Sequence, residues 1–143
     1  MIARVLLLGS ALLFLALLLS HHAVAARMLD LETAALARVP AAAAAGERPE
    51  AVEGGYRFRW LGGGEAAPLL VAEPVRPGAD AVRVFATLDG RTVYEFDPVT
   101  SRIRDDRPEP EELRRWLLIP APERARRPHP PGSWRPVAPG GGG

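Results

Sequence analysis

Residues 83–96 read RVFATLDGRTVYEF, and this stretch decides the fold class. At its centre, Asp89 and Gly90 supply two residues that tolerate positive φ between runs of β-branched and aromatic residues, which is the pattern of a two-residue hairpin. Closing the hairpin there places Phe85 opposite Tyr94 and puts Phe96 on the same side, so these aromatic side chains are expected to form the core face. The stretch therefore predicts antiparallel strands.

Further strands are expected on both sides of this hairpin. Residues 56–61, YRFRWL, alternate aromatic with charged residues, as a strand with one solvated face does. Residues 68–75 contain the apolar run LLVA between a glycine-rich turn and a Pro-Gly turn. After the hairpin, Pro98 favours a turn, and residues 102–104 can form a short returning strand. We therefore expect a sheet of about four or five strands.

A helix is expected at residues 110–119, where the apolar period changes from that of a strand to that of a helix. Pro110 suits the first helical turn, and Leu113, Trp116 and Leu117 recur on one face at i, i+3 and i+4. This helix should pack on one side of the sheet. The expected fold class is α+β: a small antiparallel sheet with a packed C-terminal helix, after an N-terminal signal or anchor helix and before a disordered tail.

The N-terminal residues carry an export signal. Arg4 precedes an uninterrupted apolar run from Val5 to Leu19. Small residues at Ala23 and Ala25 fit the spacing that a leader peptidase requires, with cleavage after Ala25. The run alone would form a helix of roughly 22 Å, which is short of the ~30 Å hydrocarbon core. If it is not cut, the helix continues to Ala26, gains the missing length and acts as a signal anchor.

Both outcomes place the remaining chain outside the cytoplasm. The protein is periplasmic or secreted if the segment is removed, and it is a single-pass inner-membrane protein with its N-terminus inside if the segment is kept. The sequence divides into four segments: the signal peptide or signal anchor at 1–25, then 26–55, 56–119 and 120–143. A short helix at 27–39 and an Ala/Gly/Pro linker lie in 26–55, the small α+β domain is 56–119, and the Pro-, Arg- and Gly-rich residues 120–143 are expected to be disordered.

Composition narrows the possible partners. All 18 basic residues are arginine, and Lys, Asn, Gln and Cys are absent, which is the bias expected of a bacterial genome rich in G and C. The charges nearly cancel, at a formal net charge of +1, so nucleic-acid binding is not expected. A small core without disulfides supplies little stability, so a protein partner, the membrane or self-association is expected to contribute.

Residues 56–119 offer few catalytic groups. They contain no His, Cys or Lys and a single serine, Ser101, so this segment cannot provide a Ser-His, Cys-His or Ser-Lys arrangement. Carboxylates remain, and a carboxylate-dependent hydrolase is a distant alternative. Most of them suit turns and helix starts instead. We therefore expect that the protein is not an enzyme and that it has neither a cofactor nor a metal site.

Two groups of residues are candidates for interaction. The strand at 56–61 can present an aromatic and two cationic side chains, or a free sheet edge, to an envelope protein, unless its aromatic residues simply face the core. The tail can contact anionic lipid or cell-wall polymer, unless it is merely solvated. The candidates are Arg57, Arg59 and Trp60 in the strand and Arg126, Arg127, Trp134 and Arg135 in the tail. The sequence thus predicts a non-enzymatic interaction or accessory module, or an inner-membrane-anchored protein with a binding tail.

Overall fold

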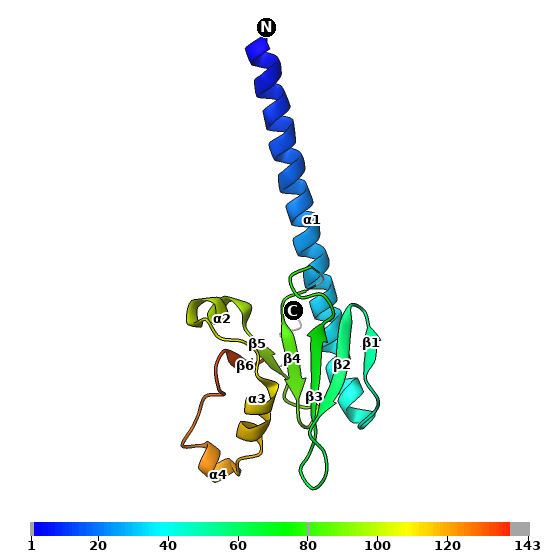
Figure 1. Ribbon diagram of the computed structural model, residues 1–143, viewed down its shortest axis with the longest axis vertical. Helices are drawn as coiled ribbons and strands as arrows, with labels where there is room; N and C mark the ends of the chain where they lie inside the picture. Colours follow the sequence, from blue (N-terminus) through cyan, green and yellow to red (C-terminus); the bar gives the residue numbers. More distant parts are fainter. Residues whose placement is uncertain (1, 80, 138–143) are drawn as a thin grey trace.

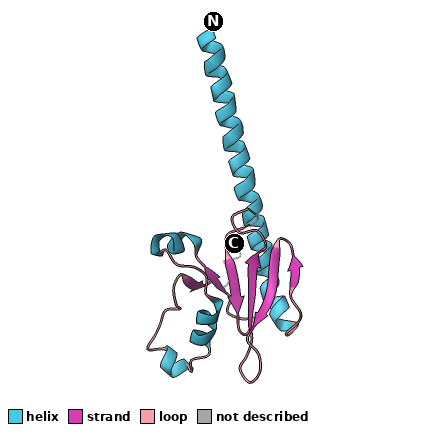
Figure 2. Ribbon diagram, in the orientation of Figure 1, coloured by secondary structure: helices cyan, strands magenta, loops and turns pink. Residues whose placement is uncertain are grey.

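A computed structural model describes residues 2–79 and 81–137 of the chain. Its strands form one six-stranded antiparallel sheet in which β1 to β6 lie in sequence order (Figures 1 and 2). The α+β class is therefore correct, but the strand count is higher than expected and the helices lie differently. The elements are α1 (Ile2–Ala44), β1 (Ala51–Glu53), β2 (Tyr56–Leu61), β3 (Leu69–Pro74), β4 (Val84–Thr87), β5 (Tyr94–Phe96), α2 (Pro98–Arg104), α3 (Pro110–Leu117), α4 (Ala121–Arg124) and β6 (Trp134–Pro136).

The C-terminal part of α1 covers one face of the sheet. Ala35 and Val39 are fully buried there and pack with Phe58, Leu70 and Phe85 from β2, β3 and β4. Residues three or four apart lie on the same face of a helix, and the small side chain of Ala35 leaves room for the aromatic rings of the sheet. The sequence predicted a helix in this region without indicating that it forms a wall of the core.

The opposite face of the sheet is covered by α3. Leu113 and Leu117 are buried against Leu69, Val71 and Val84. Strand β3 therefore carries apolar side chains on both of its faces, as strands covered on both sides do. The expected single layer of helix on one side of the sheet is thus corrected to two layers, because α1 supplies the second.

The structure also differs from the expected linker at residues 40–55. α1 continues through Pro40 to Ala44, and β1 occupies residues 51–53. Alanines 41–45 are the strongest helix formers, and the loop between β4 and β5 lies against this part of α1. A Cβ atom on Gly90 would lie 3.0 Å from the Cβ of Ala43, and Gly90 has φ +73°. Only glycine satisfies both the positive φ and this close approach.

The hairpin centred on Asp89-Gly90 has a different register from the one predicted. Ala86 pairs with Tyr94, so the connection is longer than two residues. The Thr87 hydroxyl donates to the Thr92 carbonyl at 2.8 Å and accepts from the Gly90 N–H at 2.9 Å, and these bonds stabilise the wider loop. Because side chains alternate between faces, a shift of one residue moves a strand's side chains to the opposite face.

The predicted aromatic core face is therefore wrong. Phe85 lies in the cluster under α1, whereas Phe96 belongs to the cluster under α3, against which Tyr94 also packs. Glu95 takes the place opposite Phe85. The two aromatic residues of β5 thus contribute to a different layer from the one that the hairpin pattern indicated.

The returning strand predicted at residues 102–104 is also wrong, because these residues end α2. Asp97 is the N-cap: its carboxylate accepts from the Val99 N–H at 3.0 Å and from the Thr100 hydroxyl at 2.6 Å. Pro98 occupies the first helical position, where its missing N–H costs nothing. The helix forms because its cap and first turn are both satisfied locally.

The C-terminal tail differs from the expected disorder over residues 121–136, which include α4 and β6. β6 pairs with β5, opposing Trp134 to Phe96. Trp134 is only 4% exposed, and its ring meets that of Phe96 edge to face at 5.4 Å. Burial of one large ring holds this proline-rich segment on the sheet. Residues 138–143 of the tail lie outside the described residues.

The N-terminal part of α1 projects beyond the domain (Figure 1). Its large apolar side chains between Val5 and Val24 are exposed, and the contacts of α1 with the sheet core begin at Leu31. By length and composition, Arg4–Ala44 could cross a membrane. This feature is consistent with a membrane anchor and with a signal sequence.

Glu32 links α1 to the sheet and gives a test of this fold. It is 7% exposed, and its Oε1 accepts from the backbone N–H groups of Val82 and Arg83 at 3.1 and 3.2 Å. Glu32→Ala removes both bonds, so we expect the free energy of unfolding to fall by about 1–3 kcal/mol. Thermal unfolding in detergent, followed by tryptophan fluorescence, measures this loss. Glu47→Ala, at an exposed position, is the control and should leave the midpoint unchanged.

Candidate functional site

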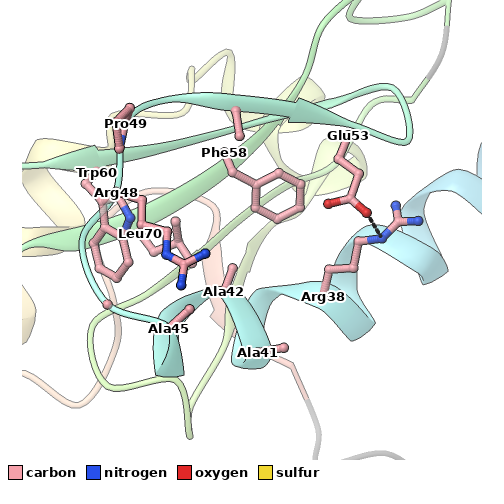
Figure 3. Close-up of a pocket in the computed structure, with 12 residues that line it drawn as sticks. Arg38, Ala41, Ala42, Ala45, Arg48, Pro49, Glu53, Phe58, Trp60 and Leu70 are labelled. Atoms are coloured by element: carbon pink, nitrogen blue, oxygen red, sulfur yellow. Dashed lines mark ion pairs between the residues drawn. The ribbon is translucent and has the colours of Figure 1, made fainter.

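A groove of about 330 Å³ lies between the end of α1 and the strands β1 and β2 (Figure 3). Its floor is apolar and its rim carries charged groups. The residues that line it are Arg38, Ala41, Ala42, Ala45, Gly46, Arg48, Pro49, Ala51, Glu53, Phe58, Trp60 and Leu70. Concave apolar surfaces with a few polar groups are the usual form of binding sites.

Small helix residues create the space. Ala42 points toward Phe58, and Ala41 and Ala45 also line the groove; their single methyl groups do not fill the gap between the helix and the sheet (Figure 3). Phe58 belongs to the buried core, while Trp60 is only partly buried and packs at its edge. The groove is therefore an open extension of the core on the α1 face, with part of an indole ring available for contact.

The charged rim has two different ends. Arg38 Nε forms an ion pair with Glu53 Oε1 at 3.2 Å, which joins α1 to β1 and neutralises both groups. Arg48 is exposed and forms no ion pair with any residue that the structure describes. Its guanidinium group can therefore donate hydrogen bonds to a carboxylate of a ligand, because the planar N–H fork matches the two carboxylate oxygens.

Strand β1 adds a second feature next to the groove. Among the residues that the structure describes, it pairs only with β2, so its outer edge has no strand partner there. Its residues are exposed, and Val52 is 62% exposed. An open edge of this kind can pair with an extended segment of another protein. Ala51 and Glu53 of the same strand line the groove, so both features could serve one ligand.

The structure separates the candidate residues of β2. Arg57 and Arg59 lie on the opposite face of the strand from Trp60, because successive side chains alternate. Arg57 forms an ion pair with Glu50 at 3.1 Å, and Arg59 binds both oxygens of Glu73, at 2.9 and 3.3 Å. Only Trp60 of these three lines the groove.

The candidate residues of the tail are also separated. Trp134 of β6 is buried in the cluster with Phe96, and Arg135 is bound to Glu95 at 2.7 Å and to Asp97 at 3.1 Å. Arg126 and Arg127 are exposed after α4. The aromatic and basic residues of the tail therefore do not form one binding surface, because half of them stabilise the sheet edge.

Several carboxylates of the domain are bound by arginine or serine side chains. Besides Glu73, Glu95 is only 7% exposed and lies between Arg83 at 3.4 Å and Arg135 at 2.7 Å. The Asp106 carboxylate accepts from the Ser133 hydroxyl at 2.8 Å. Within residues 2–79 and 81–137 there is no group of three His, Cys, Asp or Glu residues that could hold a metal ion.

Sequence reasoning missed most of the groove. Arg48 and Pro49 lie in the segment expected to be a linker, and the alanines of α1 carry no chemical signal of their own. The run of small residues at 41–45 was the only signal in the sequence that could have suggested a cavity. Nothing in the sequence indicated that Trp60 would lie beside it. Their proximity is set by the packing of α1 on the sheet.

The chain matches no protein-family model, no curated protein and no solved structure. The features that bear on its function are the groove, the sheet edge and the apolar helix.

The Asp97 carboxylate provides a pH-dependent test of the cluster that joins β5, α2 and β6. The hydrogen bond from the Thr100 hydroxyl, the N–H of Val99 and the nearby guanidinium of Arg135 hold the pKa of Asp97 below its ordinary value of 3.8, against the effect of burial. A carboxylate with a lowered pKa stabilises the folded state above pH 3.8, and this contribution is lost as the pH falls through the lower folded-state value.

We therefore expect Asp97→Asn to lower the unfolding midpoint at pH 7 and to lose this effect in acid. The asparagine keeps a side-chain acceptor for the helix cap but loses the charge that faces Arg135. Thermal unfolding between neutral and acid pH measures the difference between the two proteins. Asp30→Asn, at an exposed position on α1, is the control. A difference that stays constant with pH would contradict the charge-based account.

Proposed function

We propose that the protein is a membrane-anchored module of the bacterial envelope that binds another envelope protein. In this proposal α1 spans the inner membrane with the N-terminus inside, and the domain lies outside. The span from Val5 to Val24 is 20 residues long. As a helix it extends about 30 Å, which matches the hydrocarbon core. Arg4 lies on the cytoplasmic side, in agreement with the positive-inside rule.

The observation that carries the anchoring is the continuity of α1. The same helix is apolar and exposed near its N-terminus and buried against the sheet near its C-terminus, and Ala23 to Ala25 lie inside it. The segment between Val24 and Leu31 is also helical, so the membrane span and the domain are joined without a flexible linker. A continuous helix holds the domain in a fixed position relative to a membrane anchor. A signal peptide that is removed needs no such rigid connection to the domain.

The partner suggested by the groove is an extended protein segment. Its backbone would pair with the open edge of β1, and an apolar side chain would lie against Phe58 and Trp60. An acidic side chain, or the carboxylate at the end of a chain, would bind Arg48. This combination of an aromatic contact, a free arginine and an open edge supports a binding role over catalysis.

The other two candidate functions have weaker support. A tail that binds lipid or cell-wall polymer would need the group that includes Trp134 and Arg135, and both are bound within the domain. A carboxylate-dependent hydrolase would use a second cleft, of about 370 Å³, which Asp105, Asp106, Glu109 and Glu112 line. There the Asp106 carboxylate is bound by the Ser133 hydroxyl, and the other three carboxylates are exposed next to the start of α3, where they suit the positive end of the helix. We therefore propose binding to an envelope protein as the function.

Anchoring is tested by the intact mass of the protein recovered from bacterial membranes. We expect the whole chain, of 15.4 kDa, to remain with the membrane after alkaline extraction, because the span of α1 matches the bilayer. A variant with Leu12→Arg and Leu15→Arg should lose the membrane association, since charges at the centre of a span are costly. A soluble product that begins at Ala26 would contradict the proposed anchor.

Partner binding is tested by a photo-crosslinking amino acid at Val52 in the full chain in cells. We expect one defined envelope protein to be crosslinked, and we expect Arg48→Glu or Trp60→Ala to reduce the product several-fold, because these side chains line the groove. Arg126→Glu, a charge reversal at an exposed site far along the chain, is the matched control and should retain the product. Equal crosslinking in all variants would contradict binding in the groove.

A further inference from the structure

Helix α2 presents an apolar and basic face to solvent. Val99, Arg102 and Ile103 lie at i, i+3 and i+4, so their side chains share one face of the helix. Val99 is 66% exposed and Ile103 is 81% exposed. Outside α1, these two are the most exposed large apolar residues that the structure describes. We call Val99, Arg102 and Ile103 the α2 face.

The order of the strands places α2 at the end of the domain from which α1 emerges. β3 and β5 are both antiparallel to β4, so they run in the same direction and their C-terminal ends lie at the same end of the sheet. The connection from β3 to β4 therefore lies at the same end as α2. Glu32 of α1 accepts hydrogen bonds from Val82 and Arg83 in that connection, and Figure 1 shows α1 leaving the domain there.

The distance along α1 brings this end of the domain close to the bilayer. Eight residues separate Val24, the end of the apolar span, from Glu32, which corresponds to about 12 Å of helix. The interfacial layer on each side of the hydrocarbon core is roughly 5–7 Å thick. A membrane helix tilts by about 20° on average, which moves one side of an attached domain toward the lipid.

The chemistry of the α2 face fits this interface. Aliphatic side chains next to an arginine are the composition by which short segments lie at the boundary between headgroups and acyl chains, with the guanidinium group on an anionic headgroup. Val75 and Val82, each about a third exposed, lie at the same end of the domain.

We infer that the α2 face contacts the lipid surface of the membrane that α1 spans, and that this second contact fixes the orientation of the domain. The inference rests on the proposed anchoring by α1. Because α1 runs along the sheet from this end, its other end carries the groove about 18 Å farther from the bilayer than Glu32. The contact thus holds the groove and the open edge of β1 away from the lipid, where a partner can reach them.

The absence of cysteine makes a direct test possible. The full chain is reconstituted into nanodiscs that contain anionic lipid, with Ile103→Cys carrying an environment-sensitive fluorophore. Glu65→Cys, in the exposed loop between β2 and β3 at the opposite end of the domain, is the control. Quenching by a lipid with a spin label near its headgroup is compared with quenching by a water-soluble ion. The intact mass of each sample shows separately that α1 is present, so a failure of anchoring is distinguished from a failure of this contact.

We expect the label at position 103 to be quenched several-fold more strongly by the spin-labelled lipid than the label at position 65, and to be protected from the soluble quencher. Arg102→Glu should reduce the lipid quenching, and neutral lipid should reduce it as well. Equal lipid quenching at the two positions would overturn the inference. Protection from the soluble quencher without lipid quenching would also overturn it, since a second copy or another protein would then cover α2.

Discussion

The packing of α1 on the sheet is the interaction on which the rest of the structure depends. Ala35 and Val39 close one face of the core, and Glu32 satisfies two backbone donors at the edge of that face. Without this helix, the rings of Tyr56, Phe58 and Phe85 would be open to water. The element that forms a wall of the core also extends into the apolar span. If α1 is the proposed anchor, the same contacts that stabilise the domain also set its position relative to the membrane.

Ion pairs on the same face extend this arrangement to the β6 edge of the sheet. Glu95 is nearly buried, and a buried carboxylate is costly unless cations surround it. Arg83, beside β4, and Arg135 of β6 supply those cations, so one carboxylate connects three neighbouring strands. Trp134 is then buried on the other face of β6, against Phe96. The short edge strand is held by one ring and one network of charges rather than by its length.

The two ends of the domain carry different chemistry. The end from which α1 leaves bears the α2 face, and the other end of α1 borders the groove with Trp60 and Arg48. This separation arises because α1 runs along the strands of the sheet. The start and the end of its packed part therefore lie at opposite ends of the domain. The alanines that form one wall of the groove are compatible with helix formation and leave space beside the strands. A binding role away from the membrane is thus consistent with how the helix is built.

The sequence by itself determined the elements whose signals are local. The alternation in residues 56–61, the apolar run in 69–72 and the helical period at 113–117 each predict an element that the structure contains. The Asp97-Pro98 pair is also local, but it suits a turn and a helix start equally, and the capped helix forms because Thr100 and Val99 complete the cap. The apolar character of the first 26 residues is likewise plain in the sequence.

Only the tertiary structure decided which face each residue occupies. The hydroxyl of Thr87 widens the hairpin and shifts β5 by one residue, which exchanges Phe96 and Glu95 between the two faces. Trp134 joins the sheet through a partner 38 positions earlier in the chain, and the groove exists only because alanines of α1 lie opposite Trp60. Such contacts depend on the closure of long loops and on the packing of side chains, and periodicity within a short window carries no information about either.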